Sequence, residues 1–422
     1  MARPSLALGF TALGLMATVA AAQEASAFKF SGFGSLAATR SSEDKADFYS
    51  NFAMPNGPGY SRSTDLKGDS RVGLQGDLRM GDYFSAVVQV VSEHRYDDSF
   101  KPYLNIASLK LQAMPGLAFR VGRIPYSAYL ISDFAKVGYA QPWVRPPVEV
   151  YQFNPLTAVD GADISWQFNA GEVAFSGQFL GGTSNAKISP SLLAVAATPA
   201  GQETPASEWK GDNFLGASVA INYGSTTFRV FHGQMKGTFN DLGFDGPVGP
   251  FGGMGPFTAL RVLPPAFGGN PALADQYQIR KDKLIYQSAA FNYDPGSWFL
   301  MVEATRKSGD ENMFLHFTSG YATLGVRLGT WTPYATYGWK HTTSPTTNAN
   351  PIINGLLANL DRAQTSYSGG LRWDFYKNLA LKLQYDHVTN ATGSYGALTN
   401  SQPGFKTGES YNLSTVSLDF VF

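Results

Sequence analysis

Charged and apolar side chains alternate along several short segments of this sequence. In an extended strand this spacing gathers the charged side chains on one face, where they can act together on ions or solutes. In one segment, Val72, Leu74 and Leu78 share a face of an extended chain. Arg71 and Arg79 then share the opposite face, because successive side chains of a strand point to opposite sides. Rows of charge around a water-filled passage can set ion preference. The same argument predicts further inward-facing cations in later segments: Lys110, Arg120, Arg327, Arg372 and Lys382.

The sequence contains few of the residue patterns that catalysis requires. A hydrolase on a barrel needs a nucleophile with a histidine, or paired carboxylates. None of the five histidines lies in a G-x-S-x-G or H-E-x-x-H context, and the chain has no cysteine. The sequence therefore predicts no enzyme, no metal site and no cofactor. The histidines are His94, His232, His316, His341 and His387.

Composition limits the class of protein. The formal net charge of the 422 residues is zero, so no basic face argues for nucleic acid. Apart from the beginning of the chain, no apolar stretch approaches the roughly 20 residues of a spanning helix. Any membrane insertion must then use strands, because only helices and closed barrels satisfy the backbone in lipid.

The first residues read as a secretory signal peptide. Arg3 precedes an apolar run from Leu6 to Val19, and small-residue sites follow. We predict a signal peptide at 1–27, because a strand pattern begins directly afterwards, with 1–22 as the alternative. The mature chain is then 28–422.

The lengths of the connections between strand-like segments predict the architecture. Very short connections rich in Gly, Asp, Asn and Pro alternate with long ones, which is the pattern of an outer-membrane barrel. The count is about sixteen antiparallel strands, with both ends on the short-turn side. We therefore predict an all-β transmembrane barrel with short periplasmic turns and long extracellular loops. The predicted long connections are 41–67, 94–102, 125–157, 181–212, 237–282, 308–314, 342–361 and 390–409.

Aromatic residues gather beside the short connections, as expected for an interfacial girdle. Examples are Tyr83, Trp166, Trp298 and Trp331, together with Phe299. The final segment alternates as well: Val416, Leu418, Phe420 and Phe422 share one face. We predict that this strand pairs with the first one and closes the sheet, leaving no free edge.

The sequence resembles the Gram-negative outer-membrane porins. Within that family it is most similar to a branch that looks like the general porins. The resemblance rests on the final strand ending in Phe422, on the block GLRWDFYKNLALKLQYDHV and on a long third loop reading GRIPYSAYLISDFAKVGYAQPWVRPPVEVYQ. It covers 28–422 and implies sixteen strands, a homotrimer, and a third loop folded inward as a constriction. It also implies that the assembly machinery recognises the last strand through Phe420 and Phe422. This third loop is less acidic than that of cation-preferring porins, which argues against cation preference.

The third loop, 125–157, supplies further candidate pore residues. Its prolines fix the backbone and block ladder pairing, so it forms a rigid crossing segment. We expect Lys136 and Arg145 to lie opposite Lys110 and Arg120 and to give a weak anion preference. The loop's acidic candidates are Asp133 and Glu149.

The resemblance implies a channel for passive diffusion of small hydrophilic solutes and ions in the outer membrane, with lipid as a partner. Two alternatives stay open: a selective channel for a sugar, small carboxylate or aromatic acid, with a binding track in the third loop, and an outer-membrane enzyme. The sequence names no solute and gives no choice of face for the strand at 283–293. The tyrosines and tryptophan that would form such a track are Tyr126, Tyr129, Tyr139, Trp143 and Tyr151.

Overall fold

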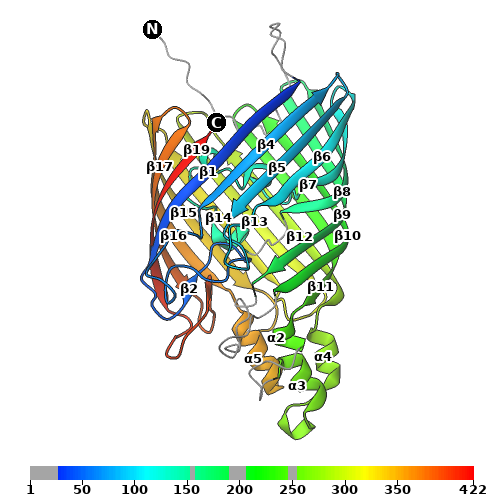
Figure 1. The fold of residues 1–422 in the computed structure, drawn as a ribbon, viewed down its shortest axis with the longest axis vertical. Coiled ribbons are helices and arrows are strands. Elements are labelled where there is room, and N and C mark those ends of the chain that lie inside the picture. The colour runs from blue at the N-terminus through cyan, green and yellow to red at the C-terminus, as the bar shows by residue number, and fades with distance from the viewer. Residues whose placement is uncertain (1–26, 153–156, 190–205, 246–253) are drawn as a thin grey trace.

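Sixteen long antiparallel strands form a closed barrel in the computed structural model, which describes residues 27–152, 157–189, 206–245 and 254–422 (Figure 1). The predicted fold class is confirmed. The predicted signal peptide lies outside the described residues. The wall strands are β1 (Phe28–Ser41), β4 (Arg71–Met80), β5 (Phe84–Glu93), β6 (Tyr103–Met114), β7 (Leu117–Pro125), β8 (Ala158–Ala170), β9 (Val173–Ile188), β10 (Ser207–Tyr223), β11 (Thr226–Asn240), β12 (Arg280–Tyr293), β13 (Trp298–Gly309), β14 (Phe317–Val326), β15 (Trp331–Thr342), β16 (Gln364–Tyr376), β17 (Leu379–Asn390) and β19 (Ser410–Val421).

The short connections all lie at one end of the barrel, where β1 begins and β19 ends (Figure 1). Their residues suit tight turns: Gly81 has φ of 66° and Asn378 has φ of 63°, values that most side chains avoid. The alternation of short and long connections predicted from the sequence is therefore confirmed.

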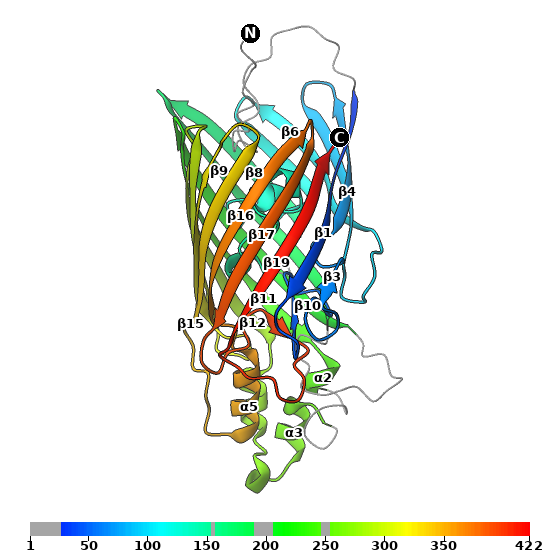
Figure 2. The ribbon, with the colours of Figure 1, turned by 90° about the vertical axis from the view of Figure 1, so that its left-hand side faces the viewer.

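The last strand closes the barrel. β19 pairs with β17 on one side and with β1 on the other, and β1 also pairs with β4 (Figure 2). Phe422 continues this seam, because its backbone N–H and C=O both bond to Gly32 at 3.0 Å. A Cβ at Gly32 would lie 2.3 Å from the Phe422 ring, so only glycine lets the ring lie flat against β1.

The predicted lipid and lumen faces are confirmed for most of the assigned strands. Val72, Leu74 and Leu78 are exposed on the outside of the barrel, whereas Lys382 and Asp419 are buried inside it. The structure also shows which face of the strand at 283–293 points into the barrel. Its even-numbered residues, such as Leu284 and Ser288, face inward. Most of the aromatic girdle is exposed outside the short-turn end, but Phe299 is only 3% exposed and faces the lumen.

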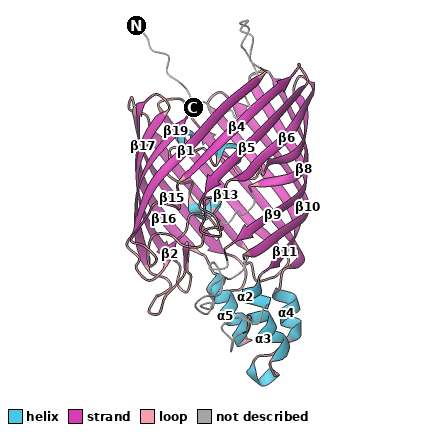
Figure 3. Cartoon of the chain, in the orientation of Figure 1, coloured by secondary structure: helices cyan, strands magenta, loops and turns pink. Residues whose placement is uncertain are grey.

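The long loops hold structure that the sequence did not predict. The strands β9 to β12 run further than expected, so the loops between them are shorter. The loops after β11 and β15 carry helices that pack together beyond the barrel mouth (Figure 3), where Asn350 of one loop donates to the Gly268 carbonyl of the other at 2.7 Å. Among the described residues, no helix is long and apolar enough to cross a membrane. The helices are α2 (Leu242–Asp245), α3 (Pro256–Val262), η4 (Pro265–Phe267), α4 (Pro271–Tyr277) and α5 (Pro351–Leu360).

The first and last outer loops also pair. The short strands β2 (Asp47–Phe48) and β18 (Leu398–Thr399) form a two-stranded sheet, while β3 (Thr64–Asp65) extends the wall beside β1. Phe48 and Leu398 are both buried there. The two loops nearest the seam are therefore joined above it, which adds to the closure of the barrel.

Candidate pore and constriction loop

The third loop joins β7 to β8 and folds into the barrel (Figure 3). It comprises residues 126–157, of which 153–156 are outside the described residues. Its backbone is irregular, with η1 (Ser132–Phe134), η2 (Gly138–Ala140) and α1 (Val148–Tyr151). In an irregular segment many backbone N–H and C=O groups have no hydrogen-bond partner within the segment, so other parts of the protein must supply the partners. The wall supplies those partners.

Arg145 anchors the loop to the seam of the barrel. Its guanidinium donates to the Asp69 carboxylate at 2.8 Å and 3.0 Å, and to Asp386 at 2.8 Å. It also donates to Thr39 of β1 at 3.0 Å and is only 4% exposed. Burial alone would lower the pKa of Arg145, but the two carboxylates raise it above its ordinary value. This arginine is a permanently charged, fully paired anchor.

Two more cations hold the loop through its carbonyl oxygens. Lys382 of β17 donates to the carbonyls of Gly138 and Trp143 at 2.8 Å and 2.7 Å, and lies 2.7 Å from Asp419. Arg372 of β16 donates to the carbonyl of Tyr139 at 2.6 Å. A Cβ at Gly138 would lie 2.4 Å from a wall side chain, so the loop backbone approaches the wall as closely as glycine permits.

Carboxylates of the wall and of the loop complete this attachment. Glu303 of β13 accepts hydrogen bonds from the Leu130 N–H at 3.0 Å and the Tyr151 hydroxyl at 2.6 Å. Glu149 of the loop accepts from Gln364 of β16 at 2.7 Å. Burial raises the pKa of Glu149. The loop is therefore held along the wall from β13 through β19 to β1.

The loop also borders a cavity. A space of about 120 Å³ lies between residues 132–137 of the loop and the β4–β6 wall, lined there by Arg71, Gln89 and Asn105. Lys136 pairs with Glu93 at the end of β5, and Arg71 lies 3.9 Å from the same carboxylate. Burial lowers the pKa of Lys136 despite that pairing. Charged and polar groups thus face an open space here, not a packed contact.

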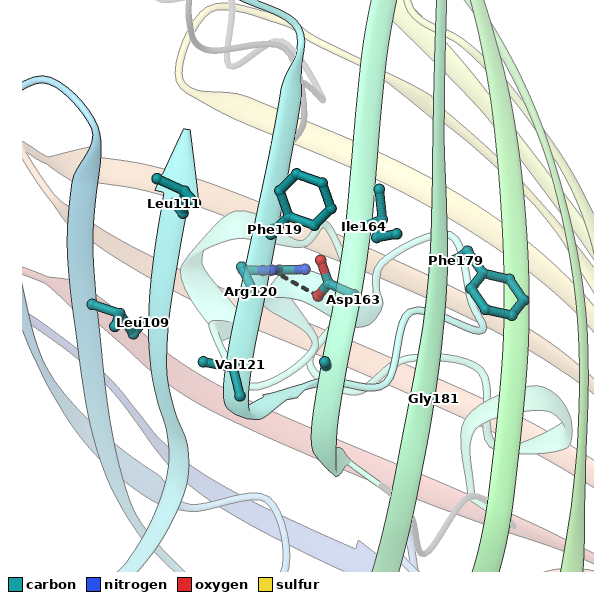
Figure 4. Close-up of a pocket in the computed structure, with 10 residues that line it drawn as sticks. Leu109, Leu111, Phe119, Arg120, Val121, Asp163, Ile164, Phe179 and Gly181 are labelled. Carbon is teal, nitrogen blue, oxygen red and sulfur yellow. Dashed lines mark hydrogen bonds and ion pairs between the residues drawn. The ribbon is translucent and has the colours of Figure 1, made fainter. Parts of the chain in front are cut away.

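A third group of charges lies on β6 to β8. Arg120 donates to Asp163 at 2.8 Å, and Lys110 is the register partner of Arg120. Figure 4 shows this ion pair together with Phe119 and Val121 of the same strand as Arg120, which line an apolar pocket on the outer face of the wall. Phe119 and Val121 are exposed. The alternation of β7 therefore separates the charged row from the lipid-facing row, as predicted.

The predicted pore residues fall into different groups. Arg71, Asp133, Lys136 and Arg145 all border the cavity, and Lys110 and Arg120 lie on the neighbouring wall. Our expectation that Arg145 faces Lys110 and Arg120 is wrong, because Arg145 is buried against the other wall. The remaining predicted residues lie elsewhere: Arg372, Lys382 and Glu149 in the attachment of the loop, and Arg79 exposed near the short turns.

Arg327 also lies away from the loop. It follows β14 in a short turn, where it donates to Asp294 of the neighbouring turn at 2.6 Å and 2.7 Å. Its expected place at the constriction is therefore wrong. The reason is that β14 ends at Val326, so the strand alternation no longer governs the next residue.

Sequence reasoning missed several residues of the site. Asp69 lies in a loop without periodicity, and nothing local connects it to Arg145. Gln89 and Glu93 lie on β5, whose valines occupy both faces and hide the alternation. The odd positions of β5 face inward, and only its pairing with β4 shows this.

Comparisons with known proteins agree with this architecture. No family model and no curated relative matches the sequence. Among solved structures, the anion-selective porin of Comamonas acidovorans aligns with a TM-score of 0.54 at 14% identity, covering 94% of this chain and 99% of that chain. Salmonella typhi OmpF in complex with daunomycin aligns with a TM-score of 0.52 at 8% identity, covering 94% and 97%. A loop L8 deletion mutant of OmpT, an outer membrane protein of Vibrio cholerae, aligns with a TM-score of 0.51 at 12% identity, covering 94% and 100%.

These likenesses show the fold: the chain has the barrel fold of the outer-membrane porins. Its exposed apolar outer face and its aromatic belt are those of a protein that spans the outer membrane of a Gram-negative bacterium.

Proposed function

We propose that this protein is an outer-membrane porin, a channel for passive diffusion of small hydrophilic solutes and ions. The observation that carries the proposal is the division of the barrel interior. One wall binds the third loop tightly, while the other wall keeps charged and polar side chains around a cavity. A loop that narrows a barrel without filling it is a size-selective constriction, and no bound cofactor is needed for diffusion through it.

The test is reconstitution of the purified barrel. In planar bilayers it should produce stepwise ion conductance, and in liposomes it should admit small sugars faster than large ones. Correctly assembled protein is recognised by heat-dependent migration on gels. Assembled protein that gives neither conductance nor swelling would contradict the proposal.

Assembly and partners form a second part of the proposal. We expect a homotrimer surrounded by outer-membrane lipid, and recognition of the last strand by the assembly machinery. Deleting Phe422 removes both backbone bonds to Gly32 and its ring contact, so the variant should assemble poorly. Cross-linking in native membranes tests the trimer, and an equal yield of folded barrel without Phe422 would refute the role of that residue.

The competing classes are a selective channel and an outer-membrane enzyme. An enzyme would turn over a substrate, so hydrolysis by the purified barrel would displace the diffusion proposal. A selective channel is compatible with it, and the polar groups around the cavity favour that version.

A further inference from the structure

The cavity beside the third loop has room for one small solute. Its volume is about 120 Å³, and it lies between loop residues 132–137 and the wall strands β4 to β6. Since one water needs roughly 10–15 Å³ of such space, the cavity accommodates on the order of ten water-sized groups. That is the size of a metabolite with fewer than about ten non-hydrogen atoms. The cavity is therefore a single-solute site, too small for a disaccharide.

Two cations in the cavity lining share one carboxylate. Arg71 and Lys136 both approach the one carboxylate of Glu93, at 3.9 Å for Arg71 and within hydrogen-bond distance for Lys136. This trio has a net charge of +1. Nε of Arg71 is buried and has no hydrogen-bond partner among the described residues. A planar guanidinium with free donors is the group that binds a carboxylate most specifically.

The same cavity also presents free acceptors. Asn105 is 6% exposed and donates through its amide to Gln89 at 2.6 Å. Its Oδ1 is buried without a hydrogen-bond partner among the described residues. Leaving a buried acceptor unpaired costs free energy, so such a group in a native site calls for a donor.

Asp133 lies in the same lining and brings a negative charge. Within the described part of the chain it forms no ion pair, and it accepts only a long hydrogen bond of 3.4 Å from Ser127. The cavity therefore combines a spare positive group on the wall with a spare negative group on the loop. Ile106 and Pro125 supply apolar contact between them.

We propose that this cavity binds small zwitterions of the amino-acid class on their way through the channel. The solute's carboxylate binds Arg71, its ammonium group binds Asp133 and the Asn105 oxygen, and a short side chain contacts Ile106. A simple anion would leave the acceptors unpaired, and a simple amine would leave Arg71 unpaired, so each binds more weakly. The inference rests on the proposed channel function and adds a solute class to it.

The test uses three solutes that differ by one group. L-alanine carries both charges, propionate lacks the ammonium group, and ethylamine lacks the carboxylate. Each is titrated against the ion current of the reconstituted channel, and block or excess current noise reports residence in the pore. We expect L-alanine to act at a concentration roughly tenfold to a hundredfold lower than either analogue, the usual effect of one charged hydrogen bond.

Variants assign the effect to this cavity. Arg71→Gln and Asp133→Asn should each weaken the L-alanine effect roughly tenfold or more. Arg79→Gln is the matched control, because Arg79 faces the lumen from the same strand but does not line the cavity. Arg79→Gln should leave the L-alanine effect unchanged. Asp133→Asn changes a loop side chain without changing its shape, so this variant should still assemble. It provides the test if Arg71→Gln fails to assemble.

The outcomes separate the two proposals. A conducting channel on which the three solutes act equally overturns the zwitterion site and leaves the channel function standing. The same holds if Asp133→Asn responds to L-alanine as the unmodified protein does. An assembled barrel without conductance overturns both.

Discussion

Arg145 and Arg71 are two arginines near carboxylates inside one barrel, and both line the cavity beside the third loop. Arg145 is enclosed by Asp69 and Asp386 and is 4% exposed. Arg71 shares a single carboxylate with Lys136 and faces a cavity. A guanidinium whose donors are all used holds a structure together, whereas one with donors to spare can bind a solute. The number of carboxylates paired with the guanidinium, not residue type, decides which role applies.

The contacts that anchor the loop also explain why a cavity remains beside it. Lys382, Arg372 and Glu303 bind loop backbone groups directly. These contacts hold the loop against the wall from β13 to β1, and Lys136 pairs with Glu93 on the β5 side. We therefore expect the aqueous passage to follow the wall from β4 to β6, where the cavity lies. The predictions below are given from the largest expected effect to the smallest.

Removing the loop should abolish the difference between the two sides. Deletion of 128–147 removes the anchoring residues and the cavity together, so single-channel conductance should rise several-fold and solute size discrimination should decline. Any residual ion preference should be weakest in concentrated salt, where the Debye length falls to about 3 Å at 1 M. A normally assembled deletion variant with unchanged conductance would show that the loop is not the constriction.

Arg145→Ala should weaken the attachment of the third loop to the wall. It leaves Asp69 and Asp386 buried without their partner, which typically costs about 3–5 kcal/mol. We expect a lower thermal unfolding midpoint and a noisier open channel, because the loop is no longer fixed. Arg71→Gln is the control and should change the midpoint much less, since its side chain is partly exposed. Equal midpoints for the two variants would contradict this division of roles.

Acidity should act on the Glu149 contact and on the Asp69–Arg145 contact of the loop in opposite directions. Burial raises the pKa of Glu149, so its contribution to stability is full below the ordinary carboxyl pKa and declines as pH rises through the raised value. Burial would also raise the pKa of Asp69, but Arg145 lowers it on balance, so its contribution is lost only in stronger acid. Mild acid should therefore increase protection of the loop amides near Glu149 in hydrogen exchange.

Glu149→Gln supplies the control for this pH effect. An amide cannot ionise, so the variant should show the same protection at mildly acid and neutral pH. Gln364 can still donate to the new side-chain carbonyl. If the variant keeps the pH dependence, then a group other than Glu149 causes it.

The smallest expected effect concerns ion preference. Lys110→Gln removes one cation from the cavity-side wall, where Asp163 already pairs with Arg120. The reversal potential in a salt gradient should shift slightly toward cations while conductance is retained. Gln112 on the same strand offers a control, because Gln112→Ser changes no charge. A shift of equal size in both variants would exclude a charge effect.

Much of the fold was predictable because it depends on local patterns. Alternation along Leu117–Val121 assigns faces, and turn residues such as Gly81 and Asn378 mark the short connections. The apolar face of the final segment requires a partner, and β1 is the free edge available to it. The helices beyond the mouth were not predicted, because loops rich in Gly and Pro carry little periodicity.

What the sequence determined by itself is the barrel, its two faces and the inward crossing of the third loop. What only the tertiary structure decided is which charges anchor that loop and which remain free for solutes. Arg145 and Asp386 are 241 positions apart, and no local pattern links them. Arg145, Lys136 and Arg71 all read alike in the sequence as cations for the pore. Their roles differ because burial and the number of carboxylates within reach differ, and both are fixed only when the barrel closes around the loop.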